Sequence, residues 1–521
     1  MNSVLHNIRA ALTAPQHSAW TGWRGHLVAL VAGGLLPLAF APYHLFPLAL
    51  VAPVLLWLVI QEGPPRTAGW RGWLFGLGMF GVGTSWIYVS IHDFGYTEVS
   101  LAVLLTGLFA AFLALFPASL ALALAKSTQY LSPAARRYAP LSVLPAAWVL
   151  WEWVRGWILT GFPWLNLGYS QQHTPLAGWA PLLGVYGVSL LVAATGGALL
   201  VAVSTPERRV RMALGGLLAV LWGGGYALTW VPWTAADGVP LKVSLIQGNV
   251  SQHVKWSPQN LSRTIDLYGG LTLAHLDSDV IVWPETALPL FYHEAAPLLQ
   301  QLTEATAAKG SAVLIGLPVQ NLETNEFYNS VVSLRPRMEF YYKRHLVPFG
   351  DYLPLANLLR GAINFFNLPM SNFSRGDANV APVVTAGAHR VGVTVCYEDA
   401  FGEEVIAGLP QAAYLVNVSN DAWWGDSFGP HQHLQIAAMR ALETGRYLVR
   451  ATNTGITAVV DPQGDIVARI PQFVTEVLTT QIQPRRGATP YVYVGNGLVV
   501  IICIAMWGGL AWFGRSNPWK P

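Results

Sequence analysis

Residues 391–399 read VGVTVCYED, and this stretch predicts both the kind of fold and the kind of chemistry. Its valines alternate with other residues in the manner of a buried β-strand, and Cys396 follows where the strand ends. The only other cysteine in the sequence, Cys503, lies in an apolar run near the C-terminus and cannot easily meet it. A free thiol at a strand end serves either packing or reactivity. The polar residues that follow Cys396 favour reactivity.

Two more strand-like runs end in a charged residue: DVIVWPE ends at Glu285, and MEFYYK ends at Lys343. In layered α/β folds, polar residues just past strand ends share one edge of the sheet. A nearby Lys343 would lower the pKa of the Cys396 thiol and stabilise an oxyanion. Glu285 would take the thiol proton and return it to a leaving group. Each residue alone is more simply a packing or solvated side chain, but together they predict a nucleophile, a cationic partner and a general base.

Short β-rich runs alternate with helix-like stretches throughout the middle of the chain, which has the composition of a soluble domain. This alternation predicts a layered α/β domain of about 250 residues, large enough for a full hydrophobic core. The predicted strands are 242–246, 280–283, 312–317, 330–334, 339–342, 390–395, 414–418, 448–452, 456–460 and 466–470, and the predicted helices are 258–275, 294–309 and 430–444.

The composition of the whole chain indicates a membrane protein. Of its 521 residues, 53% are hydrophobic and only 11% are charged. Soluble domains are about 25% charged, so much of this chain must lie in lipid. The apolar parts are residues 1–235 and 493–513, which enclose a domain at 238–488. The formal net charge of +3 gives no indication of nucleic-acid binding.

A helix needs about 20 apolar residues to cross a bilayer. We therefore expect a multispanning α-helical membrane domain with seven helices in residues 1–235, and one further transmembrane helix over 493–513. A cleaved signal peptide in place of the first span is disfavoured, because that apolar run begins late and further runs follow it. The predicted spans are 26–42, 46–60, 72–91, 99–125, 140–159, 177–204, 212–232 and 493–513.

Lysine and arginine gather in alternate connections between these spans, and the intervening short loops hold almost none. By the positive-inside rule, both termini are predicted to lie in the cytoplasm. Seven crossings then place residues 238–488 on the far side of the membrane, which in a bacterium is the periplasm. The residues that set this orientation are Arg9, Arg24, Arg66, Arg71, Lys126, Arg136, Arg137, Arg208, Arg209, Arg211, Arg515 and Lys520.

Two pairs of polar residues have alternative interpretations. Glu152 and Arg155, near the end of a predicted span, form either a couple paired at the membrane interface or a substrate-facing pair. His431 and His433 raise the question of a metal, but residues two apart on a helix diverge, and no further ligand cluster is evident. We expect neither a metal nor a cofactor.

Three motifs carry a resemblance to a known superfamily: WPETA (283–287), YYKRHLVPFGDYLP (341–354) and VCYED (395–399). They resemble the glutamate, lysine and cysteine motifs of the nitrilase superfamily, which implies an αββα sandwich with a Glu-Lys-Cys triad. The flanking membrane segments and the runs at 419–446 and 155–164 (RGWILTGFPW) narrow the match. Together they resemble the bacterial apolipoprotein N-acyltransferase family over essentially the whole chain.

The resemblance implies a role for each matching residue. Cys396 would be the acyl-accepting nucleophile, Glu285 the general base and Lys343 the oxyanion stabiliser. One position departs from the family, because Asp351 stands where relatives often carry glutamate, and its shorter side chain puts its role in doubt. The other residues that match supporting or substrate-facing positions are Trp164, Trp256, Tyr397, Glu398 and Trp424.

The implied reaction is a two-step acyl transfer in the bacterial inner membrane. The Cys396 thiolate would take the sn-1 acyl chain of a phospholipid, preferably phosphatidylethanolamine, as a thioester. The α-amine of the S-diacylglyceryl cysteine of an apolipoprotein would then accept that chain. Because both substrates are anchored in lipid, the site must open toward the membrane. The apolar run at 355–373 is predicted to be a mobile flap over the site, with packing into the domain as the alternative.

Three other functions are compatible with parts of the sequence. A membrane-tethered amidase or nitrilase-type hydrolase would use the same triad and release the acid to water. A transporter with a regulatory soluble domain is disfavoured, since the predicted spans lack the recurring buried charges of an ion-coupled path. A non-catalytic relative of the nitrilases is disfavoured by the intact set of Glu285, Lys343 and Cys396.

Overall fold

The structure is a computed structural model that describes residues 21–513 except 62, 336 and 355–371. The chain forms two compact units. The helical unit comprises residues 1–85, 103–231 and 496–521, and the sandwich unit comprises 86–102 and 232–495. Most of the predicted flap at 355–373 lies outside the described residues.

Close packing between helices characterises the helical unit. In α2 and α4, glycine lets the two backbones approach, because a Cβ on Gly33 would lie 1.9 Å from the carbonyl oxygen of Phe75. Small residues of this kind are typical of helices that associate in lipid. The helices are α2 (Trp23–Leu35), α3 (Pro47–Ile60), α4 (Pro65–Gly83), α6 (Val99–Leu113, shared with the sandwich unit), α7 (Leu115–Thr128), α8 (Pro133–Arg155), α9 (Ala180–Ser204), α10 (Arg208–Leu228) and α18 (Gly497–Phe513).

Each of the predicted spans overlaps at least one of these helices, and the span 99–125 overlaps both α6 and α7. Among the residues that the structure describes, three helical stretches are long and apolar enough to cross a membrane: Val99–Thr128, Pro175–Ser204 and Arg208–Leu228. A fourth is added if the bent pair Pro65–Gly83 and Ile87–Phe94 forms one span. The other helices are shorter or, like α8, carry several charges, so the number eight stays a prediction.

Glu152 and Arg155 are both buried in the helical unit. Arg155 donates to the carbonyl oxygen of Phe162 at 3.0 Å and to Oδ1 of Asn166 at 2.7 Å. Glu152 accepts from the backbone N–H of Leu167 at 2.8 Å. Both side chains therefore stabilise the loop after α8, which is a structural role that neither sequence interpretation included.

The sandwich unit contains two six-stranded sheets within the described residues. Each sheet has a parallel centre: β2, β3 and β4 run parallel in one sheet, and β8, β9 and β10 run parallel in the other. The first sheet has the order β13 (Glu476–Ile482), β2 (Leu241–Gln247), β3 (Val280–Val282), β4 (Ala312–Asn321), β5 (Glu326–Leu334), β6 (Glu339–Tyr342). The second has the order β12 (Ile466–Arg469), β11 (Ala458–Val460), β10 (Leu448–Thr452), β9 (Leu415–Ser419), β8 (His389–Val395), β7 (Val383–Ala386).

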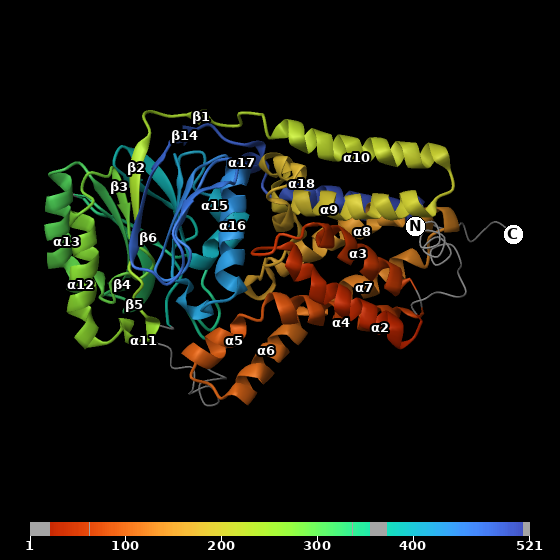
Figure 1. The fold of residues 1–521 in the computed structure, drawn as a ribbon, viewed down its shortest axis with the longest axis horizontal. Helices are drawn as coiled ribbons and strands as arrows, with labels where there is room; N and C mark the ends of the chain where they lie inside the picture. The colour runs from red at the N-terminus through yellow and green to blue at the C-terminus, as the bar shows by residue number, and fades with distance from the viewer. Residues whose placement is uncertain (1–20, 62, 336, 355–371, 514–521) are drawn as a thin grey trace. The chain divides into compact units, whose positions relative to one another are not determined.

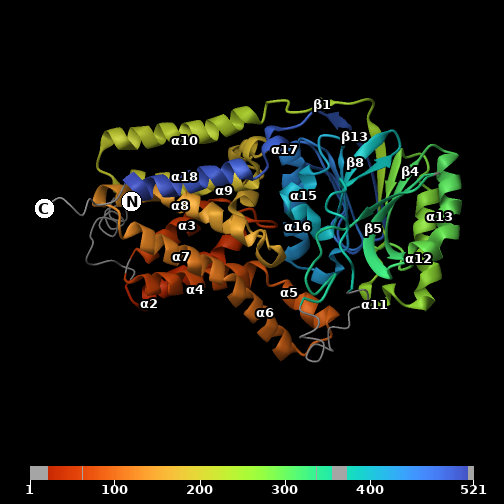
Figure 2. The same cartoon turned by 180° about the vertical axis from the view of Figure 1, so that it is seen from behind.

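Helices cover the outer faces of both sheets (Figures 1 and 2). Helices α12 (Pro258–Leu273) and α13 (Tyr292–Ala307) pack on the first sheet, whereas α15 (Gly402–Ile406) and α16 (Phe428–Thr444) lie on the side of the second. The order of layers is thus helix, sheet, sheet, helix. This arrangement confirms the predicted nitrilase-like αββα sandwich.

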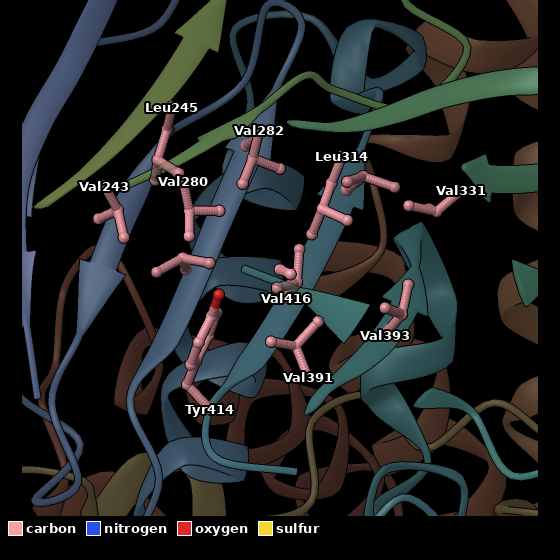
Figure 3. Packing of buried hydrophobic residues seen from close by; sticks show 14 of the residues in the cluster. Val243, Leu245, Val280, Val282, Leu314, Val331, Val391, Val393, Tyr414 and Val416 are labelled. Carbon is pink, nitrogen blue, oxygen red and sulfur yellow. The ribbon is translucent and has the colours of Figure 1, made fainter. Parts of the chain in front are cut away.

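The core of the sandwich lies between the two sheets (Figure 3). Val243 and Val280 of the first sheet face Val391 and Val416 of the second, and all four are fully buried or nearly so. Alternation explains this arrangement, because every second residue of a strand points to the same face. The opposite faces of the same strands pack under the helices. Both faces are therefore buried, which is why these central strands are apolar throughout.

Candidate active site

Glu285 and Lys343 meet at one edge of the first sheet. Strand β3 leads to Glu285, and β6 ends directly before Lys343. Strand β6 is antiparallel to β5, which is antiparallel to β4, so β6 runs in the same direction as β3 and β4. Their carboxyl ends therefore share an edge. Nζ of Lys343 lies 3.6 Å from Oε1 of Glu285.

Lys343 is buried between two carboxylates. Its Nζ lies 2.7 Å from Oδ2 of Asp351, closer than to Glu285. The same Asp351 oxygen accepts the backbone N–H of Val347 at 2.7 Å, which fixes the turn that brings it there. The shorter side chain thus reaches the lysine after all. Burial alone would lower the pKa of Lys343, but Asp351 and Glu285 outweigh it and raise that pKa, so the lysine stays charged.

Glu285 is held by a residue that the sequence analysis missed. Nδ2 of Asn329, on β5, donates to Oε1 of Glu285 at 2.7 Å, and the carbonyl oxygen of Asn329 accepts the N–H of Lys343 at 2.8 Å. One buried residue therefore contacts both partners, Glu285 through its side chain and Lys343 through its backbone. The turn after Glu285 is tight, since Thr286 has a φ of 48° and a Cβ on Gly316 would lie 2.3 Å from the carbonyl oxygen of Pro284. No sequence signal distinguishes Asn329 from other polar strand residues.

Cys396 occupies a strained turn at the end of β8. Its φ is 52°, a left-handed conformation that costs a non-glycine residue about 1–3 kcal/mol and is concentrated at functional sites. Cys396 is the first residue of the short helix η7 (Cys396–Ala400). The turn separates the thiol from the strand and leaves Cys396 partly exposed, in contrast to the buried Val395 and Tyr397 on either side.

The sequence analysis predicted that Lys343 would lower the pKa of the Cys396 thiol, but its surroundings as a whole raise that pKa. Burial raises the pKa of the Cys396 thiol well above its usual range, and Glu285 adds to the rise, although Lys343 opposes it. The charge of Lys343 is already balanced by Asp351 and Glu285, so it does not offset the cost of ionising a thiol that is partly removed from water. The resting thiol is therefore neutral, and it would need a base in order to act as a nucleophile.

Glu398 links the two halves of the site and is fully buried. Its oxygens accept the hydroxyl of Tyr341 at 2.8 Å, the N–H of Arg344 at 2.7 Å and the N–H of Val395 at 2.7 Å. Burial raises the pKa of Glu398 to about 7, although these hydrogen bonds oppose the rise. Glu398 thus joins the loop after Lys343 to strand β8, which leads to Cys396, through its hydrogen bonds with Arg344 and Val395.

Comparisons with known proteins agree with this geometry. A family model for the carbon-nitrogen hydrolases matches residues 242–491, and one for the apolipoprotein N-acyltransferase N-terminal domain matches residues 32–198. The apolipoprotein N-acyltransferase of Methylococcus capsulatus is 46% identical over 92% of this chain and 95% of its own length. That of Azotobacter vinelandii is 45% identical over 90% of this chain and 91% of its own length. The chain belongs to the apolipoprotein N-acyltransferase family.

A solved structure of a CN-hydrolase superfamily protein from Xanthomonas campestris also resembles part of the chain. It is 20% identical and covers 54% of this chain and 100% of its own, with a TM-score of 0.35. A score this low adds nothing to the assignment, which rests on the two sheets, the family models and the full-length relatives.

The remaining predicted residues of the family motifs lie in different surroundings. Tyr397 is buried, and its ring packs edge-on against Phe401 at 5.1 Å. Trp424 is half-buried at the end of η8 (Asp421–Trp424), with its ring 5.0 Å from that of His433. Trp256 is partly exposed, and its indole N–H is enclosed without an acceptor among the described residues.

Trp164 differs from the other predicted residues because it belongs to the helical unit. It is fully buried there and stacks on Phe162 with 5.8 Å between ring centroids. Its carbonyl oxygen accepts from Arg155. The described contacts of Trp164 are those of a packing residue.

Lys255 is a second buried lysine beside Glu285, and the sequence analysis missed it. It ends α11 (Gln252–Lys255), directly before Trp256, and its Nζ donates to the carbonyl oxygen of Glu285 at 3.4 Å. Burial lowers the pKa of Lys255 to about 8, although the Glu285 carboxylate opposes this. A buried lysine whose positive charge is only partly balanced by a nearby carboxylate is typical of functional sites. Its position next to a tryptophan in the sequence gave no sign of burial.

Proposed function

We propose that this chain transfers a fatty acyl chain from the sn-1 position of a phospholipid, preferably phosphatidylethanolamine, to the α-amine of the S-diacylglyceryl cysteine of an apolipoprotein. The observation that carries the proposal is the Lys343–Glu285 pair beside the strained Cys396, in a chain whose full-length relatives are named apolipoprotein N-acyltransferases. The lipid donor and the roles of the three residues are parts of the proposal.

In the first step, Glu285 takes the proton of the Cys396 thiol as the sulfur attacks the ester carbon. Lys343 stabilises the negative charge that develops on the carbonyl oxygen of the ester. The carbon–oxygen bond to glycerol then breaks, and Glu285 returns the proton to the leaving alkoxide. The products are a lysophospholipid and a thioester on Cys396. A neutral resting thiol fits this sequence, because it becomes charged only when the ester is in place.

In the second step, the α-amine of the diacylglyceryl cysteine attacks the thioester carbon. Glu285 takes a proton from the amine and returns it to the departing sulfur of Cys396. An amide bond forms, the thioester bond breaks, and the free thiol is restored. Lys343 stabilises the same developing oxyanion in both steps.

For the cellular setting we propose a multi-pass protein of the bacterial inner membrane with eight transmembrane helices. Both termini would lie in the cytoplasm and the sandwich unit in the periplasm, as the distribution of lysine and arginine predicts. The domain limits 1–235, 238–488 and 493–513 belong to this proposal. Cysteine-accessibility labelling of residues introduced into the loops would test the orientation.

A membrane-tethered hydrolase of the same superfamily is the second candidate, because a carbon-nitrogen hydrolase family model matches the sandwich unit. The acceptor distinguishes the two candidates. The test incubates purified protein with a phospholipid that carries a labelled sn-1 chain, with and without a diacylglyceryl peptide. We expect labelled N-acyl peptide in amounts equal to the lysophospholipid formed. Rapid release of free fatty acid, unaffected by the peptide, would favour the hydrolase.

Two variants control this test. Cys396→Ala should abolish both products, whereas Cys503→Ala, which removes the other thiol, should leave both unchanged. Equal activity of Cys396→Ala and the unchanged protein would contradict the proposal.

A further inference from the structure

A cluster of four charged residues lies buried behind Cys396, and the mechanism above does not use it. We call His433, Asp399, Asp421 and Arg450 the histidine cluster. They come from α16, η7, η8 and β10, and none is more than 2% exposed. Charges are rarely buried unless they are paired and hydrogen-bonded. A network of this kind at an active site therefore needs an explanation.

Each member of the histidine cluster is paired. Arg450 bridges the two aspartates, with Nη1 3.0 Å from Asp399 and Nη2 2.9 Å from Asp421. His433 bridges them from the other side, with Nε2 2.9 Å from Asp399 and Nδ1 3.0 Å from Asp421. Two carboxylates thus face one guanidinium and one imidazole ring.

The partners of His433 indicate which charge it carries. Nε2 faces the Asp399 carboxylate and, at 3.3 Å, the carbonyl oxygen of Cys396. Both of these groups only accept hydrogen bonds, so Nε2 carries a proton. Nδ1 faces the Asp421 carboxylate, which favours a second proton, although Nη2 of Arg450 at 2.7 Å works against it. With both protons the cluster is neutral, and with one it has an excess negative charge.

The balance of these effects favours the imidazolium. Burial and Arg450 lower the pKa of His433, but the carboxylates of Asp399 and Asp421 outweigh them and raise it. Arg450 and Asp421 keep their own charges, because the pKa of the guanidinium is raised and that of the carboxyl is lowered within the cluster. The charge of the cluster as a whole is therefore controlled by the proton on His433.

The histidine cluster contacts the nucleophile at two places. The carbonyl oxygen of Cys396, in its strained turn, is held by Nε2 of His433 and by Nδ2 of Asn417 at 3.1 Å. Ser419 hydrogen-bonds the Cys396 thiol, and its hydroxyl donates to Oδ1 of Asp421 at 2.7 Å. Both the backbone and the sulfur of Cys396 thus respond to the charge of the cluster.

We propose that His433 is a positioning residue for the acylation of Cys396. Held as an imidazolium between Asp399 and Asp421, it fixes the carbonyl group of Cys396 in the strained turn. It also cancels the negative charge that would otherwise oppose the developing thiolate. This inference rests on the proposed function, because it assigns His433 a part in forming the acyl-enzyme.

A pH dependence follows from the groups that face His433, which are Asp399, Asp421, Arg450 and the carbonyl oxygen of Cys396. The pKa of His433 is raised, so the imidazolium persists below that pKa and is lost as the pH rises through it. Loss of the proton leaves an excess negative charge beside Cys396. The contribution of His433 to acylation therefore disappears on the alkaline side.

The test measures the single-turnover rate at which Cys396 is acylated by phosphatidylethanolamine vesicles. The acyl-enzyme is detected by intact-mass spectrometry, and the rate is followed from about pH 6 to about pH 10. We expect His433→Asn to slow acylation by about 10- to 100-fold at neutral pH, as is typical when a residue that orients a reacting group is lost. The variant should also lose the alkaline decline. His431→Asn is the matched control, since His431 lies on the same helix but is only half-buried, and it should behave like the unchanged protein.

A second variant separates charge from folding. His433→Asn combined with Asp421→Asn leaves one aspartate facing Arg450, which restores a neutral cluster. We expect this double variant to acylate faster than His433→Asn alone. A purely structural role for His433 predicts the opposite, because the double variant loses more hydrogen bonds. Equal rates and equal pH profiles for His433→Asn and the unchanged protein would overturn the inference.

Two outcomes distinguish this inference from the proposed function. If the unchanged protein forms no thioester from phospholipid, the proposed function fails. If it does, nitrogen-15 chemical shifts of labelled histidine give a direct answer without any variant. We expect a His433 ring with both nitrogens protonated at neutral pH, and a neutral ring would overturn the inference alone.

Discussion

The ammonium of Lys343 lies 2.7 Å from Oδ2 of Asp351 and 3.6 Å from Oε1 of Glu285. The lysine is therefore paired mainly with the aspartate. Glu285 keeps enough freedom to act as a base while it remains within the field of the cation. In the proposed mechanism the two carboxylates have different roles, because Asp351 fixes the lysine and Glu285 takes and returns protons.

Asp351→Asn should lower the acylation rate by about 10²-fold, which is typical of losing one electrostatic contact in an active site. Without the aspartate, Lys343 would pair more tightly with Glu285 and make it a weaker base. Asp351→Glu keeps the charge, so it should stay within about tenfold of the unchanged protein. The measurement is single-turnover acylation. An unchanged rate in Asp351→Asn together with a slower rate in Asp351→Glu would show that side-chain length, and not charge, matters at this position.

Glu285→Gln should separate the reactivity of the thiol from catalysis. Because Glu285 helps to raise the pKa of the Cys396 thiol, its loss should lower that pKa and speed alkylation by iodoacetamide at neutral pH. The thiolate fraction rises about tenfold for each unit by which the pKa falls, and the alkylation rate rises by less, because a thiolate of lower pKa is a weaker nucleophile. Acyl transfer should nevertheless be lost, since the base is gone. The measurement is best made with Cys503→Ala as the background. Slower alkylation in Glu285→Gln would contradict the neutral resting thiol.

Lys255→Met should make the protein more stable at neutral pH. The pKa of Lys255 is lowered to about 8 by burial, so at neutral pH the fold carries a buried charge at a cost. Between that pKa and the ordinary lysine value the folded state has lost the proton that the unfolded state still binds, so stability rises with pH. The advantage of Lys255→Met in thermal unfolding should therefore be largest at neutral pH and shrink above about pH 8. A variant that unfolds earlier at neutral pH would contradict this account.

Glu398→Gln should slow acylation by about 10²-fold. Both oxygens of the carboxylate accept hydrogen bonds, whereas the NH₂ group of the amide can only donate them. Its NH₂ group would face the N–H donors of Arg344 or Val395 and separate the lysine loop from the cysteine turn. The effect should appear in the acylation rate while the affinity for phospholipid is kept. The control is Glu403→Gln, which changes an exposed residue on α15. Similar rates for the two variants would remove the positioning role of Glu398.

The sequence predicted the central strands of the sandwich well, because they are apolar runs buried on both faces. It missed β7 and β13, each of which is one of the two edge strands of its sheet, and the two-residue strands β1 (Ala235–Ala236) and β14 (Arg485–Arg486), whereas it found the other two edge strands, β6 and β12. In β13 apolar residues are mixed with polar ones, and buried positions are mixed with exposed ones. Strand β7 has only four residues. Edge strands bury less surface, so their hydrophobic pattern is weaker.

The candidate site shows the same limit. Cys396, Glu285 and Lys343 could be predicted because each follows an apolar strand. Asn329 and Lys255 could not, since their proximity to Glu285 depends on turns that join distant segments. The neutral state of the thiol was missed because a pKa depends on burial, and burial depends on the complete fold. Sequence motifs thus predicted which groups form the candidate site, whereas the structure was needed for their protonation states.

The central claim is that Cys396 carries the acyl chain between the two substrates, and peptide mass spectrometry tests it most directly. The protein is exposed to a phospholipid with a labelled sn-1 chain, digested and analysed with and without hydroxylamine. The account predicts the labelled chain on the peptide that contains Cys396, as a hydroxylamine-labile thioester that disappears when a diacylglyceryl peptide is added first. An unmodified Cys396 in protein that still produces N-acyl peptide would contradict it.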